Sequence, residues 1–320
     1  MAEPRREFAA LPAAVHGGDA APGTIDFSTG VSPLPPPPSV MAAWRAADVT
    51  RYPHPTALPL REAIARRHAV AADEVVVGAG SVELVWALAR AFGGAGRHVG
   101  WLAPAFGEYA QAALASGAES AAVAIDGACD LLFVARPGNP LLGVPSIEGA
   151  RASLVVVDEA YQPLCDGVPP MAPSERVVVL RSLTKVFALP GLRLGYLVAS
   201  RTVARAVQAA LPPWNVSQPA IAAGLAALAE PIDPVRGAIA ELRARMLARL
   251  AAVGVTPVVA GGTFVVIDVG DARAFAAAML ARGVRVRDCT SFGLPAYVRL
   301  GVRGDDDVSA LVAAWQALRP

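Results

Sequence analysis

Two ionisable residues lie in apolar surroundings, where charged side chains are uncommon. Lys185 is the only lysine among 320 residues, and arginine supplies the other strongly basic positions. It lies in the stretch RSLTKVFALPGLRLGY, residues 181–196, whose apolar neighbours would partly desolvate the amine and favour its neutral form. The ordinary alternative is a lysine on the surface. A neutral lysine amine can attack an aldehyde, so Lys185 is a candidate for covalent catalysis.

Asp158 directly follows the apolar run LVVV, which is typical of a buried strand. A carboxylate at the end of such a strand needs a cationic partner or several hydrogen-bond donors. It could cap the helix that follows. It could instead keep a heterocyclic nitrogen protonated, and Tyr161, three residues later, would then lie near the same ring.

Further polar residues follow other predicted strands, and ligands bind at this edge in open α/β sheets. Ser81 follows VVVGAG and Asn139 follows LLFVARPG. Ser81 also begins a predicted helix, whose first N–H groups and dipole would attract a phosphate. Ser182 and Arg193 could add a hydroxyl and a guanidinium, although Arg193 could also be a surface residue. Phe106 could stack on a bound ring or could simply belong to the core.

These groups together suit one kind of cofactor. It would carry an aldehyde for Lys185, a basic ring nitrogen for Asp158 and an anionic group for the start of the helix at Ser81. Pyridoxal 5′-phosphate has all three features, and we therefore expect it as the cofactor.

The elements that must position these residues are predicted from hydrophobic periodicity. Strands that are continuous apolar runs alternate with helices between residues 73 and 211, which indicates an α/β fold with a mainly parallel sheet covered on both faces. A long helix is expected over about 220–253, followed by a smaller α+β domain. We expect an N-terminal arm over 1–40, ending in a Pro-rich stretch, a large domain over 41–219 and a small domain over 220–320.

Composition argues against several other classes of protein. Hydrophobic residues make up 54% and charged residues 17% of the chain, with a net charge of +1 and no block of basic residues, so we expect no nucleic-acid binding. No uninterrupted apolar stretch is long enough for a membrane span, and the first residues do not form a signal-peptide pattern, which favours a cytoplasmic location. The cysteines, Cys129, Cys165 and Cys289, and the four histidines show no metal-binding spacing, so no metal is expected.

Four motifs carry a resemblance to a known family: VGAGSVEL (77–84), PAFGEY (104–109), VVVDEAY (155–161) and SLTKVFALPGLRLGY (182–196). The chain resembles the fold-type I pyridoxal-phosphate enzymes of the class I/II aminotransferase superfamily, over roughly residues 24–303. The resemblance implies an aspartate aminotransferase-like large domain with a mainly parallel seven-stranded sheet, a small α+β C-terminal domain and a homodimer.

The resemblance also implies roles for individual residues. Lys185 would form the covalent link to the cofactor aldehyde, Asp158 would pair with the pyridine nitrogen, and Tyr161 and Asn139 would bind the phenolic oxygen. The phosphate would be held by Gly80, Ser81, Ser182 and Arg193, with Tyr52 reaching the phosphate in the partner subunit. Phe106 would stack on the ring. Arg299 would bind the substrate carboxylate, and the candidates for the remaining substrate contacts are Ser32, Asn215 and Arg303.

Two segments favour one branch of the superfamily. IDFSTGVSPLPPP (25–37) and PPWNVSQPA (212–220) are similar to the threonine-phosphate decarboxylases of cobalamin biosynthesis. The expected reaction is therefore decarboxylation of L-threonine O-3-phosphate, a phosphorylated amino acid, to (R)-1-amino-2-propanol phosphate. The alternative is an aminotransferase of the histidinol-phosphate type. A third possibility is a catalytically silent binding or assembly protein, suggested only by the altered turn RPGNPLLG (136–143), in which Gly138 and Leu141 replace polar residues.

Overall fold

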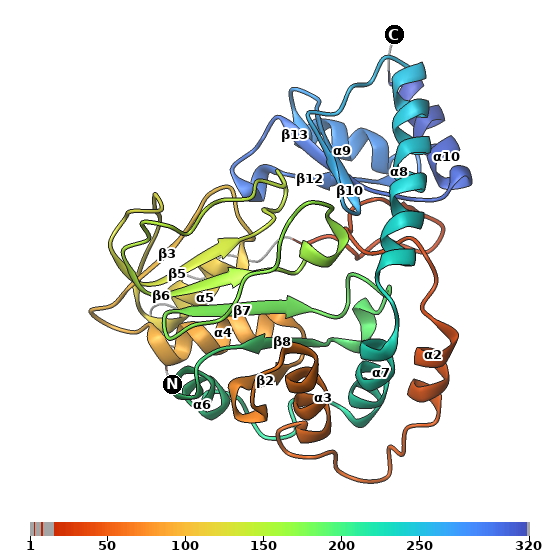
Figure 1. The fold of residues 1–320 in the computed structure, drawn as a ribbon. Coiled ribbons are helices and arrows are strands. Elements are labelled where there is room, and N and C mark those ends of the chain that lie inside the picture. The colour runs from red at the N-terminus through yellow and green to blue at the C-terminus, as the bar shows by residue number, and fades with distance from the viewer. Residues whose placement is uncertain (1–2, 4–7, 9–15, 319–320) are drawn as a thin grey trace.

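A seven-stranded sheet forms the centre of the larger domain in the computed structural model, which describes residues 3, 8 and 16–318 (Figure 1). Its order is β2-β8-β7-β6-β5-β3-β4. The strands are β2 Val75–Gly78, β3 His98–Trp101, β4 Glu119–Ala122, β5 Cys129–Ala135, β6 Ala152–Asp158, β7 Val177–Ser182 and β8 Gly195–Val198. β8 runs antiparallel to both of its neighbours, and the other pairs are parallel. The sheet is mixed and mostly parallel, which confirms the predicted fold class.

Both faces of this sheet are covered by hydrophobic clusters. Successive side chains of a strand point to opposite faces, so one strand contributes to both clusters. In β6, Val156 packs in the cluster formed with three helices on one side, whereas Val155 and Val157 pack in a cluster on the other side. The three helices are α4 Ser81–Phe92, α5 Glu108–Ser116 and α6 Arg201–Ala209. Near β2 and β8 the second face is covered by α3 Leu58–His68 and α7 Gln218–Ala229, and α7 in turn contacts α2 Pro38–Arg45.

The smaller domain is built on a four-stranded antiparallel sheet in the order β12-β13-β10-β9. Its strands are β9 Val259–Gly261, β10 Phe264–Asp268, β12 Arg287–Asp288 and β13 Tyr297–Gly301, and its helices are α8 Asp233–Ala252, α9 Ala272–Leu280 and α10 Asp305–Gln316. Short 3-10 helices occur at Ala72–Glu74, Gln162–Leu164, Pro190–Leu192 and Thr290–Phe292. Figure 1 shows α8 standing beside this domain and reaching toward α7.

The segment before the large domain contributes to the small one. β1 Ile25–Asp26 pairs in parallel with β11 Val284–Arg285, and Phe27 is fully buried in the core of the small domain. Most of the first fifteen residues of the expected arm lie outside the described residues. The division of the chain at 40 and 219 stays a prediction, and α7, which spans the second boundary, packs on the large domain.

The prediction of a single helix over about 220–253 is wrong. The structure has two helices there, and the chain between α7 and α8 is interrupted at 230–232. Pro231 explains the break, because proline lacks an N–H group and its ring disfavours helical backbone in the residue before it. Among the described residues, none of the helices combines the length and the apolar character that a bilayer crossing requires.

Candidate active site

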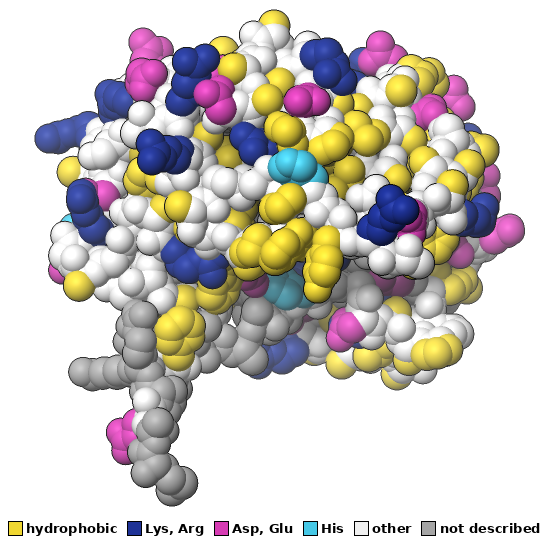
Figure 2. All heavy atoms as spheres, turned by 90° about the horizontal axis from the view of Figure 1, so that it is seen from below, with side chains coloured by type: hydrophobic (Ala, Val, Ile, Leu, Met, Phe, Trp, Pro, Cys, Tyr) yellow, Lys and Arg dark blue, Asp and Glu magenta, His cyan; other side chains and the backbone are white. Residues whose placement is uncertain are grey.

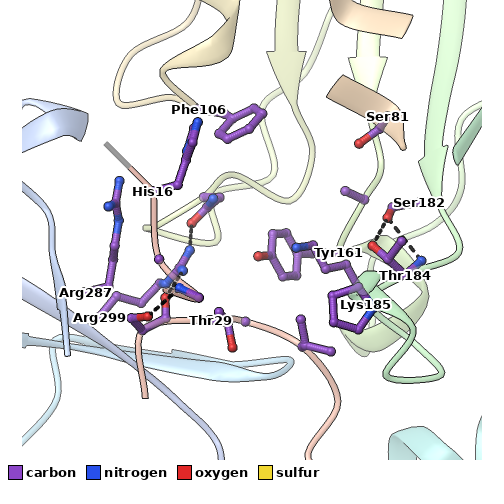
Figure 3. Close-up of a pocket in the computed structure, with 18 of the residues that line it drawn as sticks. His16, Thr29, Ser81, Phe106, Tyr161, Ser182, Thr184, Lys185, Arg287 and Arg299 are labelled. Carbon is purple, nitrogen blue, oxygen red and sulfur yellow. Dashed lines mark hydrogen bonds between the residues drawn. The ribbon is translucent and has the colours of Figure 1, made fainter. Parts of the chain in front are cut away.

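A cavity of about 680 Å³ lies at the ends of β5, β6 and β7 and reaches across to the small domain. Figure 3 shows Ser81, Ser182 and Thr184 on one side, Arg287 and Arg299 on the opposite side, and Tyr161 between them. The cavity is lined by twelve of the residues predicted from sequence: Ser32, Gly80, Ser81, Phe106, Asn139, Asp158, Tyr161, Ser182, Lys185, Arg193, Arg299 and Arg303. The chain thus gathers most of the predicted site in one place, while the role of each residue stays a prediction.

Asp158 ends β6 and is only 8% exposed. Its Oδ2 accepts a 2.7 Å hydrogen bond from the hydroxyl of Tyr109, and its Oδ1 accepts a 2.9 Å bond from the N–H of Ala160. Burial raises the pKa of Asp158, and these two donors and the charge of Lys185 oppose the rise. A buried carboxylate of this kind is stabilised by pairing with a cation such as a protonated pyridine nitrogen.

Tyr109 is a site residue that the sequence reasoning missed. Its ring is buried on α5 and stacks on Phe133 at a centroid distance of 4.9 Å, which fixes the direction of the hydroxyl toward Asp158. Burial, followed by the nearby Asp158 carboxylate, raises the pKa of Tyr109 well above its ordinary value, so the hydroxyl stays a donor. The residue belongs to the motif PAFGEY, but its distance of 49 positions from Asp158 hides the contact in the sequence.

Lys185 follows β7 and is partly buried, while the desolvation of its amine by apolar neighbours stays a prediction. Its Nζ lies 5.7 Å from the centroid of the Tyr161 ring, and its backbone carbonyl accepts a 2.9 Å bond from the N–H of Ser32. Tyr161 packs edge-on against Phe264 of β10. Lys185 thus lines the same cavity as the carboxylate of Asp158.

The start of α4 forms a site suited to an anion. Gly80 adopts φ +85°, and a Cβ atom there would lie 2.5 Å from Nη2 of Arg193. A Cβ at Gly195 would lie 2.4 Å from the backbone N of Ser81, so glycine lets β8 approach the helix. The hydroxyls of Ser182 and Thr184 lie 2.7 Å apart beside this helix end. A guanidinium, hydroxyls and helix N–H groups are the donors that phosphate prefers.

A second group of donors lies on the small domain, and its chemistry suits another anion. Arg299 of β13 donates from Nη1 to Oδ1 of Asn139 and from Nη2 to the carbonyl of Ser28 at 2.9 Å. Its buried Nε has no hydrogen-bond partner among the described residues. Arg303 donates to the carbonyl of Asp26 at 2.8 Å and to the hydroxyl of Thr29 at 3.1 Å.

Arg287 is the second residue that the sequence reasoning missed. It is paired with Arg299 across β12 and β13, and both side chains line the cavity. Burial, and then the charge of Arg299, lowers the pKa of Arg287. Two arginines held side by side in this way favour binding of a carboxylate or phosphate, which would relieve their repulsion. The run VRVRD did not identify it, because Arg285 and Arg287 fall on two different strands, β11 and β12, and of the two arginines Arg287 lines the cavity.

Two predicted residues lie away from the cavity lining in the described part of the chain. The side-chain amide of Asn215 donates to Glu83 at 2.7 Å and to the carbonyl of Val77 at 3.2 Å. These bonds direct the amide to the first turn of α4. Tyr52 is 84% exposed and lies against Trp214 at a centroid distance of 5.2 Å. The loop that carries Tyr52 is at the bottom of Figure 1, and Figure 2 shows hydrophobic side chains gathered on the surface seen from that side.

The comparisons with known proteins agree with this geometry. The sequence model of the family "Aminotransferase class I and II" matches residues 22–140 and 145–314. The chain belongs to this family. Its cofactor is pyridoxal 5′-phosphate, which the donors at α4 and the carboxylate of Asp158 fit. The comparisons favour an enzyme of this family over the third possibility, a silent protein, and the altered turn places Asn139 in the same cavity as Lys185.

Relatives and solved structures show which branch of the family the chain resembles. It is 34% identical to the histidinol-phosphate aminotransferase of Symbiobacterium thermophilum over 324 residues, which cover 92% of this chain and 90% of the relative. The histidinol-phosphate aminotransferase of Sinorhizobium meliloti, solved in complex with pyridoxal-5′-phosphate, has a TM-score of 0.80 at 24% identity and covers 92% of this chain and 91% of that one.

The expected decarboxylation of L-threonine O-3-phosphate is wrong by these comparisons. The L-threonine-O-3-phosphate decarboxylase of Porphyromonas gingivalis has a TM-score of 0.79 at 23% identity, covering 92% of this chain and 98% of that one, a likeness that shows the fold alone. Three further curated relatives named histidinol-phosphate aminotransferase are 31% or 32% identical to this chain. The two short segments that suggested the decarboxylase are outweighed by this similarity over nearly the whole chain.

Proposed function

We propose that this protein is an aminotransferase that uses pyridoxal phosphate to exchange an amino group between an anionic amine donor and a 2-oxo acid. The observation that carries the proposal is the pairing of Arg287 with Arg299 on the side of the cavity opposite Ser81 and Ser182. One anion site would hold the cofactor phosphate, and the other would hold the carboxylate or phosphate of the substrate. The proposal also rests on the similarity to the histidinol-phosphate aminotransferases.

The cofactor supplies an electron sink for negative charge at the substrate Cα. Asp158 would hold a proton on the pyridine nitrogen, because a buried carboxylate is stabilised by a neighbouring cation. Tyr109 would orient that carboxylate and favour its ionised form, since its hydroxyl donates to Oδ2 at 2.7 Å. Phe106 and Tyr161 would fix the ring from its face and its edge.

Lys185 would act as the base at the substrate Cα. An aminotransferase must remove the Cα proton and return it to a different atom, and a neutral amine can perform both transfers. Nζ of Lys185 lies near the ring of Tyr161, and Lys185 and Asp158 both line the cavity. Arg299 would set the direction of the substrate, because a guanidinium binds a carboxylate through two parallel hydrogen bonds.

A homodimer is part of the proposal. Tyr52 lies outside the cavity of its own chain and is exposed beside Trp214. Its hydroxyl would bind the cofactor phosphate of the partner subunit, which would bury the aromatic surface that now faces solvent. Exposed aromatic side chains of this kind are enriched at protein interfaces.

The test is amino transfer measured with a panel of donors. Protein loaded with pyridoxal phosphate would be incubated with 2-oxoglutarate and L-histidinol phosphate, L-phenylalanine or L-aspartate, and glutamate formation would be followed. We expect glutamate with at least one donor and highest kcat/KM with the phosphorylated one. Lys185→Ala is the control and should remove activity. Loaded protein that forms no glutamate with any donor would overturn the proposal.

A further inference from the structure

Residues 16–18 form a short segment, here called the strap, at the border of the cavity. All three residues, His16, Gly17 and Gly18, line it together with Phe106 and Arg287. Figure 3 shows His16 beside Phe106, across the cavity from Ser182 and Lys185. The ring centroids of His16 and Phe106 are 5.8 Å apart. The strap thus contacts the residue expected to stack on the cofactor ring.

A buried carboxylate holds His16 in this place. Nε2 of His16 donates to Oε1 of Glu108 at 2.7 Å, and Nε1 of Trp86 donates to Oε2 of the same residue at 2.7 Å. Glu108 is only 5% exposed, on the first turn of α5, whereas the side chain of His16 is 48% exposed. Each oxygen of Glu108 therefore has one side-chain donor, and one of these donors comes from the strap.

The path of the strap next to His16 is also closely defined. Gly18 donates from its backbone N to the hydroxyl of Ser28 at 3.0 Å. A Cβ atom on Gly17 would lie 2.7 Å from the backbone oxygen of Ser28 and 2.6 Å from its hydroxyl. Any side chain at position 17 would push the strap away from residues 26–29. Glycine at this position permits the close approach that brings His16 to Glu108.

We propose that His16 is a positioning residue that latches the strap over the cavity and slows the release of the cofactor's amine form. Opening the strap separates His16 from Glu108 and leaves one oxygen of a buried carboxylate without its donor. That loss opposes opening, because an unpaired buried charged group is unfavourable. An aminotransferase gains from such a latch, since pyridoxamine phosphate has no covalent bond to Lys185 and must be retained between half-reactions. The inference rests on the proposed function in this respect.

The test is the rate at which pyridoxamine 5′-phosphate leaves the protein, followed by its fluorescence after dilution. His16→Ala removes the latch, and Gly17→Ala displaces the strap while keeping the histidine. Both should release the probe about tenfold faster, the effect of losing one hydrogen bond to a charged group. Glu108→Gln should release the probe only about threefold faster, because an amide still accepts from Trp86 and donates to a neutral imidazole but carries no charge.

His98→Ala is the matched control, since it removes a histidine–glutamate pair, with Glu119, on the exposed edge formed by β3 and β4. It should release the probe at the wild-type rate. Wild-type release from both His16→Ala and Gly17→Ala would overturn the inference, as would an equal acceleration in His98→Ala. Faster release from the two strap variants in a protein that transfers no amino group would support the latch and contradict only the proposed function.

Discussion

The hydroxyl of Tyr109 lies 2.7 Å from Oδ2 of Asp158, and both groups are buried between α5 and β6. This bond counteracts the burial that raises the pKa of Asp158. Tyr109→Phe should therefore lower the ionised fraction of the carboxylate and reduce kcat about tenfold, a loss of about 1.4 kcal/mol. Steady-state kinetics on loaded protein would measure it. Asp158→Asn should reduce kcat more strongly, about 100-fold. Equal reductions of kcat by the two changes would contradict the larger role given to Asp158.

The carboxylate of Asp158 should also affect stability in the absence of cofactor. Its pKa is raised from an ordinary 3.8, mainly by burial, so the folded protein binds its proton more tightly than the unfolded chain. The contribution of this group is fully present below pH 3.8 and is lost as pH rises through the folded pKa. Asp158→Asn should thus be more stable than the wild type at neutral pH, and the difference should shrink in acid. Urea unfolding at several pH values would measure it.

Gly80→Ala should weaken cofactor binding selectively. The new Cβ would lie 2.5 Å from Nη2 of Arg193, and the residue has φ +85°, which strains any L side chain. We expect the Kd for pyridoxal phosphate to rise at least about tenfold, with a loss of stability of about 1 kcal/mol. Spectroscopic titration with the cofactor checks it. Gly304→Ala is the control, since Gly304 also precedes a helix, α10, but lies outside the cavity lining and has open space around the position of its Cβ.

Arg287→Ala should affect the substrate more than the cofactor. Arg287 is paired with Arg299 in the sheet, and its side chain is remote from the helix end at Ser81 in Figure 3. KM for the anionic substrate should rise about 10- to 100-fold, the effect of losing one charged hydrogen-bonding group, while cofactor affinity stays unchanged. Arg282→Ala, which removes an exposed arginine of the same domain, should change neither quantity. An unchanged KM for Arg287→Ala would remove this residue from the substrate site.

Mixed dimers test the role of Tyr52. Tyr52→Ala and Lys185→Ala would each be nearly inactive alone, because every site of either dimer would lack one component. When the two are mixed and allowed to exchange subunits, half of the dimers are hybrids, and each hybrid has one complete site. Activity should rise to about a quarter of the wild-type value. A mixture as inactive as its components would show that Tyr52 serves its own subunit or none.

The sequence predicted the large-domain site better than the substrate side. Lys185, Asp158 and Ser81 follow apolar strands or begin a helix, so period-2 patterns and the rule for strand ends bring them together in one cavity. Tyr109 and Arg287 were missed because their positions depend on the packing of α5 against Phe133 and on the register of β12 with β13. His16 was missed for a similar reason, since Glu108, to which it is hydrogen-bonded, lies 92 residues away.

The predictions from sequence failed where a single residue or a tertiary contact overrides the local pattern. Apolar periodicity continues through residues 220–253, yet Pro231 divides the helix. Asn215 lies in a motif that suggested a substrate contact, but its amide is held by Glu83 at the base of α4. The turn at 136–143 lacks polar residues that the family pattern has, and this suggested a loss of function. In the structure, Leu141 and Leu142 of the turn pack with Phe264 and Val266 of the small domain.

The pairing of β1 with β11 has a consequence for synthesis on the ribosome. Ile25 pairs with Val284, so this segment emerges long before the strand with which it pairs and must wait for that strand to reach its final position. Thr29 and Gly30 line the cavity and lie against β13 and β10. They leave the exit tunnel long before either of these strands. A nascent chain stalled before residue 284 should contain a folded seven-stranded sheet and still lack a closed catalytic pocket.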